Sequence, residues 1–582
     1  MLELQEGQQI APEKPCLVYT ERGFSLSYQG RFLYSKYAPD RAILGTIQNL
    51  TLLPGTLIIA VSPALWLGLD SLLEKLPENC FLLGVEFDEK LHDFADSELK
   101  KITENLDSVK KENLLSKVAL LPYPDNDYIV NILSGEDFPS KNEASSILPH
   151  ISTFRRAIPL EMSAGSQFNK EKYRDFASQA ENTIASFWKN RITLTKLGRL
   201  YSRNLFKNLG NLSGAIDFRK LSRTVSQPIF VFGAGESIEE TIQNISRSQL
   251  EKCFIIAVDA AAPALKAFGL RIDAIIAVEG QLAIEKAYIG ASGKDSLIIA
   301  DITSRPQVTR HRKKALTFFA SKYTDSSFFK NLSGKAFFPP VIPPLGSVGL
   351  TAIHIASLLR KNQNVPIFVS GLDFSFSLGR THGKNTPAHI ARLSAANRFS
   401  PAENYAAAFR AGAKAIAGKN AIPVITDQAL SGYALSFADF FKGMANLYDC
   451  GKQGLPLSIQ EISSEKTRMY LETIEEERPA FTAEEDSAPE ERKSNQSEIH
   501  SFLESEEKAL NRIKELLMFG NDVASCSCSL EDELTALISP REYLFLHFPD
   551  GYKCESHDIS FLKRLRSQID FFLKDIKNEL KK

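Results

Sequence analysis

The chain of 582 residues carries 69 lysine and arginine residues against 70 aspartate and glutamate residues, a formal net charge of −1. Hydrophobic residues make up 43% and charged residues 24%, which excludes a wholly disordered or fibrous chain. The charge balance gives no global case for nucleic-acid binding, because that requires an excess of positive charge. A chain of this length has room for about three or four domains.

The seven cysteines are scattered and include no C-x-x-C pair. This pattern argues against a disulfide framework or a structural zinc site and favours a reducing compartment. The first residues lack the basic start and apolar core of a signal peptide. Two uncharged stretches, residues 50–69 and 336–359, contain prolines and glycines that interrupt a spanning helix. We therefore expect a cytoplasmic protein with no membrane span.

Residues 1–165 are predicted to form an N-terminal α/β domain. Short alternating runs are followed by the apolar runs TLIIAV and CFLLGV, with a helix between them, a strand–helix–strand crossover. Glu86 ends the second of these strands, where nucleotide-binding units hold a ribose. The intervening loop SPALWLG lacks the closely spaced glycines that admit a phosphate, so the sequence favours a unit without a nucleotide.

Residues 166–222 are polar, have a helical period and are rich in Lys, Arg, Asn and aromatic residues, which predicts a packed helical connector. Residues 223–460 show the most regular α/β pattern. Continuous apolar runs of this kind are typical of parallel strands buried on both faces, and helices between them predict a doubly wound, Rossmann-type sheet. The predicted strands are residues 229–232, 254–258, 274–278, 296–299, 316–319, 366–370 and 421–424.

The end of the chain is divided by an acidic stretch. Residues 474–496 contain prolines and few apolar side chains, which indicates a flexible linker. Residues 497–582 repeat apolar positions at three- and four-residue spacing among charges, so a C-terminal helical domain is expected.

A glycine turn directly follows the first strand of the central domain. Gly233 and Gly235 permit a tight turn with close backbone approach, and the following helix offers unpaired N–H groups to an anion. Ser237 can cap that helix and also bond a phosphate oxygen. An ordinary glycine turn before a capped helix fits the same residues, so the motif alone does not establish a phosphate site.

Two acidic residues follow neighbouring strands of the same domain. Asp259 comes after FIIAV and Glu279 after AIIAV. Ligands of open α/β sheets gather outside the carboxyl ends of the strands, so both carboxylates are expected to face the ligand crevice. Asp273 precedes its strand and is expected to brace a turn at the opposite edge.

Two further segments carry residues suited to chemistry. Gly346 and Ser347 open an apolar helix and form a second potential anion site. Asp373 follows the strand at 366–370, and His382 lies close behind it in a glycine-flanked loop. A histidine in such a place can act as a general base near neutral pH, although a loop histidine without a catalytic role fits the sequence equally well.

The succession GAGES, AVDAAAPAL, GLRIDAIIAVEGQ, LGSVGLTAIHIA, VSGLDFSF and RTHGK resembles the motility accessory factor (Maf) family of flagellin glycosyltransferases. The larger superfamily includes archaeal 6-hydroxymethylpterin diphosphokinases. The similarity covers residues 223–455 well and extends weakly into the N-terminal domain and the connector. It implies a central sialyltransferase-like domain that transfers a nonulosonic acid, of the pseudaminic or legionaminic type, from a CMP-sugar to Ser or Thr hydroxyls of flagellin.

The resemblance also implies roles for individual residues. Gly233, Gly235 and Ser237 would meet the nucleotide phosphate, and Asp259 the ribose or base side. The donor pocket would include Gly346 and Ser347. The residues near the transfer centre would be Asp373, Thr381 and His382.

A metal-free reaction with no cofactor beyond the CMP-sugar is expected. The Asp-x-Asp triplet at residues 125–127 follows a proline-rich turn and is interpreted as a turn. Two alternatives remain at this point. A diphosphokinase of the same superfamily would need Mg²⁺ with ATP, although about 350 residues outside the central domain suit recognition of a protein acceptor better. A non-catalytic flagellin-binding factor is the other alternative.

Overall fold

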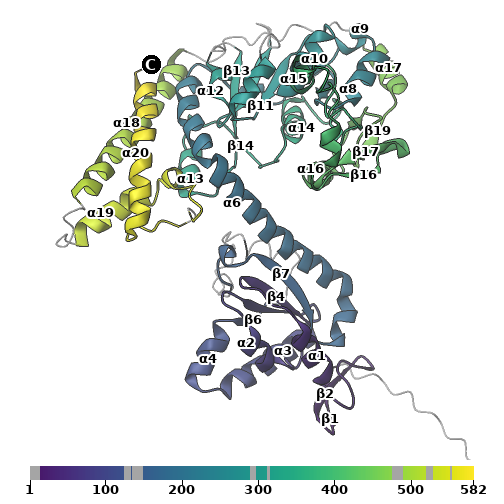
Figure 1. Ribbon diagram of the computed structural model, residues 1–582, viewed down its shortest axis with the longest axis vertical. Coiled ribbons are helices and arrows are strands. Elements are labelled where there is room, and N and C mark those ends of the chain that lie inside the picture. The colour runs from purple at the N-terminus through teal and green to yellow at the C-terminus, as the bar shows by residue number, and fades with distance from the viewer. Residues whose placement is uncertain are drawn as a thin grey trace, which may run out of the picture. The chain divides into compact units, whose positions relative to one another are not determined.

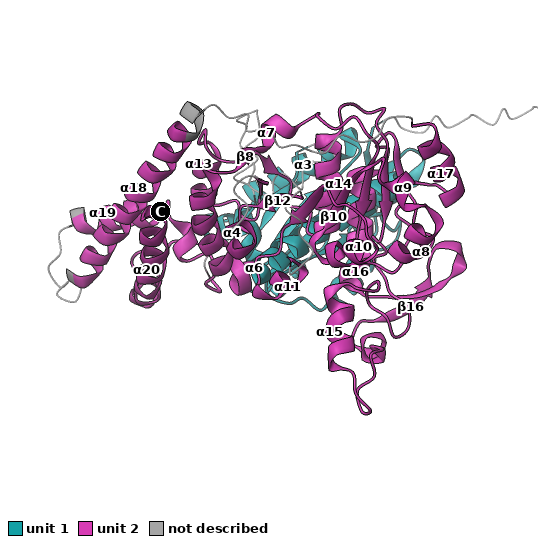
Figure 2. Cartoon of the chain, turned by 90° about the horizontal axis from the view of Figure 1, so that it is seen from above, with its two compact units in different colours: residues 1–193 teal, residues 194–582 magenta. Residues whose placement is uncertain are grey.

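The computed structural model describes residues 14–122, 133, 148–288, 296–310, 315–474, 489–519, 528–550 and 553–581. The chain divides into two compact units, residues 1–193 and 194–582, which Figure 2 colours separately. The division falls inside helix α6 (Lys170–Leu212), a helix of 43 residues that is the longest one labelled in Figure 1. The predicted connector at residues 166–222 is therefore not a separate segment, because its helix contributes to both units.

The first unit holds two sheets. A three-stranded antiparallel sheet comes first, and a four-stranded parallel sheet follows in the order β6-β5-β4-β7. The predicted crossover is confirmed, since β4 and β5 are parallel neighbours and all their residues are buried. The strands are β1 (Cys16–Thr20), β2 (Gly23–Tyr28), β3 (Arg31–Phe32), β4 (Thr56–Val61), β5 (Phe81–Val85), β6 (Val118–Leu120) and β7 (Arg156–Glu161). The helices are α1 (Arg41–Asn49), α2 (Leu69–Lys75), α3 (Glu89–Glu104) and α4 (Ser108–Leu115).

Glu86 at the end of β5 is buried and fully bonded within the protein. One carboxylate oxygen accepts hydrogen bonds from the Tyr173 hydroxyl at 2.6 Å and the Asp88 N–H at 3.1 Å, and the other accepts from the Ser62 hydroxyl at 2.6 Å. Burial raises the pKa of Glu86 above its usual range. The carboxyl group is therefore hydrogen-bonded to protein groups and does not face a ribose.

Replacing Tyr173 with phenylalanine is expected to destabilise the first unit. The Tyr173 hydroxyl donates to Glu86 and accepts from the Phe87 N–H, so Tyr173→Phe removes one hydrogen bond from each of these two groups. Such a loss costs about 1–3 kcal/mol of unfolding free energy.

The measurement is urea unfolding followed by tryptophan fluorescence. The chain has two tryptophans, Trp66 and Trp188, and both lie in the first unit. The exposed Tyr37 supplies the control, because Tyr37→Phe removes the same hydroxyl without taking a hydrogen bond from a buried group. Equal unfolding midpoints for Tyr173→Phe, Tyr37→Phe and the parent chain would contradict the expectation.

The second unit is built on a ten-stranded sheet, with the path β14-β13-β12-β11-β10-β9-β15-β18-β19 and β8 paired to β13. Neighbouring strands are parallel throughout, as predicted. Five of these strands, β9, β10, β11, β12 and β15, have only buried residues. The strands are β8 (Ile216–Asp217), β9 (Ile229–Phe232), β10 (Phe254–Val258), β11 (Ala274–Ala277), β12 (Leu297–Asp301), β13 (Leu316–Ser321), β14 (Val341–Ile342), β15 (Ile367–Ser370), β18 (Leu447–Asp449) and β19 (Gln460–Glu461).

Helices connect these strands, in keeping with the predicted doubly wound fold. The short helices are α7 (Phe218–Leu221), α8 (Ser237–Asn244), α9 (Arg247–Leu250), α10 (Ala262–Ala267), α11 (Glu285–Tyr288), α12 (Pro306–Thr309), α13 (Ser327–Ser333), α15 (Pro387–Ala395) and α17 (Ser464–Glu472). The longer helix α14 (Val348–Leu359) is rich in buried apolar residues, whereas α16 (Gln428–Phe441) buries Ala434, Phe437 and Phe441. No helix among the described residues combines the length and apolarity needed to cross a membrane.

One predicted strand of the large sheet is wrong. Residues 421–424 fall at β17 (Pro423–Thr426), which pairs antiparallel with β16 (Lys414–Ala417) in a separate two-stranded hairpin. The burial of β17 alternates, which is typical of a half-exposed hairpin and not of a central strand. The place beyond β15 is taken instead by β18, which the sequence analysis did not include.

The C-terminal helices share the core of the second unit. Tyr543 and Phe572 pack on Phe206 with ring centroids 5.0 and 6.0 Å away, and the same hydrophobic cluster includes the strands of the large sheet. Helix α18 (Pro489–Phe519) also begins inside the predicted linker, so residues 489–496 are helical. The other helices here are α19 (Cys528–Ile538) and α20 (Ile559–Leu580). The predicted C-terminal domain is thus part of one compact unit.

Candidate functional site

The candidate site lies at the carboxyl ends of the parallel strands in the second unit. The sheet grows from β9 in one direction through β10 and in the other through β15, so the connections diverge between β9 and β15. Open α/β sheets bind ligands at such a switch point. Gly233 follows β9 and Gly371 follows β15, and a Cβ atom placed on Gly233 would lie 2.2 Å from the Gly371 carbonyl oxygen. The two backbones are therefore in direct contact.

Asp373 occupies the N-terminus of helix α8, where a phosphate was predicted. Its buried carboxylate accepts hydrogen bonds from the Ser237 N–H at 3.0 Å and from the Ser237 hydroxyl. Burial raises the pKa of Asp373 to about 6, so the carboxylate is mostly ionised at neutral pH and caps the helix. A carboxylate at a helix N-terminus is in the position that otherwise attracts a ligand anion.

Two predicted placements are corrected by this geometry. Ser237 is buried, and its hydroxyl oxygen also accepts from the Gly371 N–H at 2.9 Å. The Gly235 N–H donates to the Gly371 carbonyl oxygen at 2.8 Å. The turn at Gly233 is thus closed by the protein's own groups, and Asp373 is a helix cap and not a group that faces a substrate.

A buried ion pair that the sequence analysis missed lies beside Asp373. Lys419 and Asp449 are both almost fully buried and form an ion pair, and the Lys419 ammonium also donates to the Gly451 carbonyl oxygen at 3.1 Å. The positive charge of Lys419 favours the ionised form of Asp373. Asp449 ends β18 directly, a position that the strand-end rule could have flagged, whereas nothing in the sequence marks Lys419.

The second glycine loop follows the carboxyl end of β14, so it lies on the same rim of the sheet, meaning the edge formed by the carboxyl ends of the strands. This loop is exposed to solvent. Gly346 has a positive φ of 72° and is exposed, and Ser347 is half-buried and caps helix α14. The Leu372 side chain lies between the two loops, since Cβ atoms on Gly233 and on Gly349 would each come within 2.5 Å of its Cδ2 atom. The two glycine loops therefore lie near each other, and of the two only the loop at Gly346 is available to a ligand.

Thr381 and His382 lie on a loop that is fastened to helix α8. The Gly383 N–H donates to the Ala234 carbonyl oxygen at 2.9 Å, which places His382 next to the glycine turn. The loop is also held through Arg380, which pairs with Glu239. Both Thr381 and His382 are half-buried, with 3.1 Å between the Thr381 hydroxyl and His382 Nδ1. Burial lowers the pKa of His382, so its imidazole is neutral at pH 7.

Asp259 and Glu279 lie close enough for the charge of Glu279 to act on Asp259. Asp259 is buried and accepts a hydrogen bond from the Ala260 N–H at 2.7 Å. Burial, and to a smaller extent the charge of Glu279, raises the pKa of Asp259 to about 7. Glu279 is half-buried, so this carboxyl group reaches solvent while Asp259 lies beneath the rim. Asp273 accepts from the Ile255 N–H at 2.6 Å at the other edge of the sheet, as expected for a brace.

Asp259 is expected to make stability fall as the pH rises. In the unfolded chain this carboxyl loses its proton near pH 4, whereas in the folded chain it keeps the proton up to about pH 7. The folded state binds more protons between these values, so unfolding free energy decreases across that window. Asp259→Asn removes the effect, and from pH 5 to pH 8 the variant should gain about 2 kcal/mol over the parent chain.

Urea unfolding at pH 5 and pH 8 measures this difference. The exposed Asp439 on α16 gives the control, and Asp439→Asn should leave the pH dependence as it is. A parent chain and an Asp259→Asn variant whose stabilities change in parallel with pH would show that Asp259 ionises normally.

Two tyrosines, also missed by the sequence analysis, complete this part of the rim. Burial and the charges of Glu279 and Asp301 raise the pKa of Tyr201 to about 12. Tyr433 interacts with Tyr201 electrostatically, and a Cβ atom on Gly346 would lie 3.7 Å from its ring. Tyr201 is therefore near enough to Glu279 to be affected by its charge, and Tyr433 lies beside the open loop at Gly346.

The second half of helix α6 holds two rim loops in place. Asn204 donates to the carbonyl oxygens of Gly280 and Thr303 at 3.1 and 3.0 Å. Asn208 donates to those of Ile302 and Ser304 at 2.9 Å each. The asparagines of the predicted connector thus fix the loops that follow β11 and β12.

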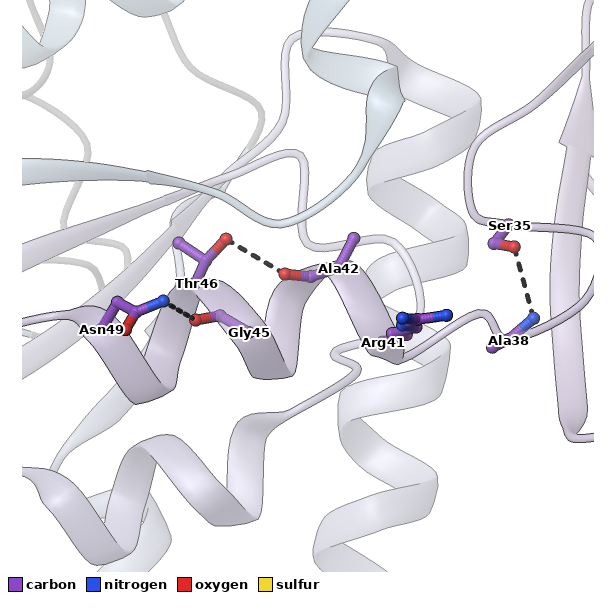
Figure 3. A pocket seen from close by; sticks show the side chains of 7 residues that line it. All are labelled: Ser35, Ala38, Arg41, Ala42, Gly45, Thr46 and Asn49. Carbon is purple, nitrogen blue, oxygen red and sulfur yellow. Dashed lines mark hydrogen bonds between the residues drawn. The ribbon is translucent and has the colours of Figure 1, made fainter.

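A separate hollow lies in the first unit. It has a volume of about 550 Å³ and is lined by residues of helix α1 and the loop before it, shown in Figure 3. Its polar side chains are bonded locally, since the Thr46 hydroxyl donates to the Ala42 carbonyl oxygen and the Asn49 amide to that of Gly45. Arg41 is its one charged residue, so the hollow lacks a constellation suited to catalysis.

The Asp-x-Asp triplet at 125–127 lies outside the described residues.

Comparison with known proteins agrees with this fold. A family model described as "6-hydroxymethylpterin diphosphokinase MptE-like" matches residues 203–379, which include Asp259 and Asp373 but end before His382. A Treponema pallidum (strain Nichols) protein named "Uncharacterized protein" is 28% identical over 584 residues, covering 96% of this chain and 94% of that protein.

One solved structure has a similar fold over most of this chain. The "Structure of MAf glycosyltransferase from Magnetospirillum magneticum AMB-1" matches with a TM-score of 0.50 and 14% identity, covering 98% of this chain and 93% of that chain. The predicted resemblance is confirmed, because the fold is similar to that of a Maf glycosyltransferase. The matching family model describes the pterin diphosphokinases, which the resemblance placed in the same superfamily.

Proposed function

We propose that this chain is a glycosyltransferase that moves a nonulosonic acid, of the pseudaminic or legionaminic type, from its CMP-activated form to Ser or Thr hydroxyls of flagellin, in support of flagellar assembly and motility. The observation that carries the proposal is the likeness to a Maf glycosyltransferase over 98% of this chain. A cytoplasmic location follows from the proposed substrates, because the CMP-sugar and unexported flagellin are both found there.

In this reaction the acceptor oxygen attacks the anomeric carbon of the sugar while the bond to the CMP phosphate breaks. His382 receives the hydroxyl proton, since burial lowers its pKa and keeps the imidazole neutral. CMP leaves with the bonding electron pair. Thr381 lies 3.1 Å from His382 and orients its ring. The donor carries its own leaving group, so no further cofactor is required.

The departing phosphate is assigned to the open loop at Gly346 and Ser347. This loop begins helix α14, a helix of 12 residues whose N-terminus favours negative charge. The turn at Gly233 and Gly235 supports this loop through Leu372 instead of binding the phosphate itself. Asp259 and Glu279 are assigned to the ribose or base.

A pterin diphosphokinase is the second candidate, favoured by the family model that matches residues 203–379. The two candidates differ in their nucleotide, and binding to the folded state raises the melting temperature. Stabilisation by CMP supports the transferase, whereas stabilisation by ATP with Mg²⁺ alone supports the kinase.

The decisive experiment is the intact mass of flagellin from cells with and without the gene. Under the proposal the flagellin loses the mass of one or more nonulosonic acids when the gene is absent, and the gene restores it. An identical flagellin mass in the two strains would overturn the proposed activity.

A further inference from the structure

Residues 378–414 form an excursion of the chain that the rest of the second unit leaves largely uncovered. Helix α15 within it has no buried residue, and residues 393–399 are all exposed. Figure 2 shows α15 and the loop after it projecting from the second unit. A surface helix normally buries an apolar face against its own chain, so the apolar side chains of α15 are available to another molecule.

Large apolar side chains are concentrated in this excursion. Single exposed hydrophobic residues are ordinary on any protein, but several in one segment mark an interaction site. We call the following six residues the docking surface: Leu378, Ile390, Leu393, Phe399, Tyr405 and Phe409, which are 60%, 46%, 52%, 90%, 48% and 82% exposed.

The excursion is held in a defined shape by its own hydrogen bonds. The Arg392 guanidinium on α15 donates to the carbonyl oxygens of Ala402 and Glu403 at 3.2 and 2.6 Å. The Asn404 N–H donates to the Gly379 carbonyl oxygen at 2.7 Å. Helix α15, the turn after it and the start of the excursion are thus fastened together, which lowers the entropy lost when a partner binds.

The charge of the excursion indicates the chemistry of its partner. Residues 378–414 contain six lysines and arginines and one acidic residue, in a chain whose total charge is balanced. Arg398 and Lys414 are exposed and have no carboxylate partner within the described part of the chain. Complementary charge steers association and fixes orientation, so the partner presents acidic groups beside apolar ones.

A protein segment fits this surface better than a nucleic acid. Half of the docking surface, Leu378, Ile390 and Leu393, is aliphatic, whereas single-stranded nucleic acids stack on aromatic rings. Arg380, Lys384 and Arg410 already pair with Glu239 and Asp427. The remaining exposed charges, Arg398 and Lys414, suit single carboxylates of a protein segment and not a continuous row of phosphates.

We propose that the docking surface binds the acceptor protein through a segment that carries apolar side chains flanked by acidic residues. The inference rests on the proposed function, since it names the part of the enzyme that selects the acceptor. The same excursion includes Thr381 and His382, and His382 is four residues from Leu378. The docking surface and the proposed base are therefore parts of one excursion.

The test uses the full chain and flagellin purified from a strain that lacks the gene. The docking variant is Ile390→Ser/Leu393→Ser/Phe399→Ser, and the control variant is Met469→Ser/Met518→Ser/Ile559→Ser, which removes three similarly exposed side chains elsewhere in the second unit. The docking variant should bind flagellin about tenfold more weakly, as expected when interface anchors are removed. The control variant should bind like the parent chain, and Arg398→Glu should weaken binding chiefly at low salt.

Stabilisation by CMP separates a failure of docking from a failure of the proposed function. The docking variant should keep the melting temperature of the parent chain and its increase with CMP, because none of its changes lies in the proposed donor site. Equal flagellin affinity for the docking and control variants overturns the docking proposal while leaving the proposed function in place. Binding of a single-stranded RNA 20-mer that the docking variant loses, without flagellin binding, overturns it in favour of a nucleic-acid surface.

Discussion

Gly371→Ala is expected to destabilise the second unit by roughly 2–5 kcal/mol. Gly371 has a positive φ of 76°, and a Cβ atom there would lie 2.4 Å from the Gly233 carbonyl oxygen. The left-handed backbone alone costs an alanine about 1–2 kcal/mol. The clash adds to this cost because the carbonyl oxygen of Gly233 belongs to the backbone of the loop after β9 and cannot rotate aside.

Gly412→Ala isolates the clash from the backbone conformation. Gly412 has a φ of 84° and no atom within 4 Å of an added Cβ, so its alanine variant bears the conformational cost alone. Denaturant unfolding followed by far-ultraviolet circular dichroism should show a much larger loss for Gly371→Ala than for Gly412→Ala. Equal losses for the two variants would mean that the loops after β9 and β15 are not in tight contact.

His382→Ala is expected to slow sugar transfer by about 10²–10⁴-fold, the usual contribution of a positioned general base. His382 is half-buried and lies beside the glycine turn, and its removal takes no apolar side chain from the core. The melting temperature, and its increase with CMP, should therefore stay near those of the parent chain. Transfer from the CMP-sugar to purified flagellin, followed by intact mass, gives the rate.

The pH profile of the parent enzyme provides a second check on His382. Because burial lowers the pKa of His382, the rate should fall only when the pH drops below the ordinary histidine value of about 6.5. His389, on the neighbouring helix α15 and bonded to the Asn385 N–H at 3.2 Å, is the control. A rate that survives His382→Ala, or that falls equally in His389→Ala, would assign the proton transfer to another group.

The central sheet could be predicted because its strands are continuous apolar runs with turns at each end. Such runs correspond to β9, β10 and β11, which are buried along their whole length. The hairpin strand β17 was misassigned because its sequence is also apolar, although its residues alternate between buried and exposed. Apolar composition shows that a segment can form a strand, but the partner of that strand depends on the rest of the fold.

The pairing of Asp373 with Ser237 could not be predicted, although both residues were singled out. They are 136 residues apart, and a carboxylate at a strand end is equally suited to face a ligand or to cap a neighbouring helix. Lys419 and Asp449 meet across two elements, and no spacing rule connects them. Strand-end rules therefore located the rim of the site but not which of its polar groups remain open.

Helix α18 includes residues that local composition did not identify as helical. Residues 489–496 were assigned to a linker from their charge and low apolar content, yet they begin with a proline and contain glutamate, arginine, lysine and glutamine. Proline is favoured in the first turn of a helix, and these other residues are good helix formers. The helix continues into a segment with buried apolar residues such as Ile499 and Leu503, and that packing stabilises its polar beginning.

The ion pair of Lys419 and Asp449 constrains how this protein can change over evolutionary time. A buried charge that loses its partner destabilises the fold by about 3–5 kcal/mol, whereas replacing both charges by well-fitting apolar residues is often neutral. Drift at either position alone is therefore opposed by selection for a folded chain. We expect homologous chains to possess both charges or neither, so the two columns should covary when many relatives are aligned.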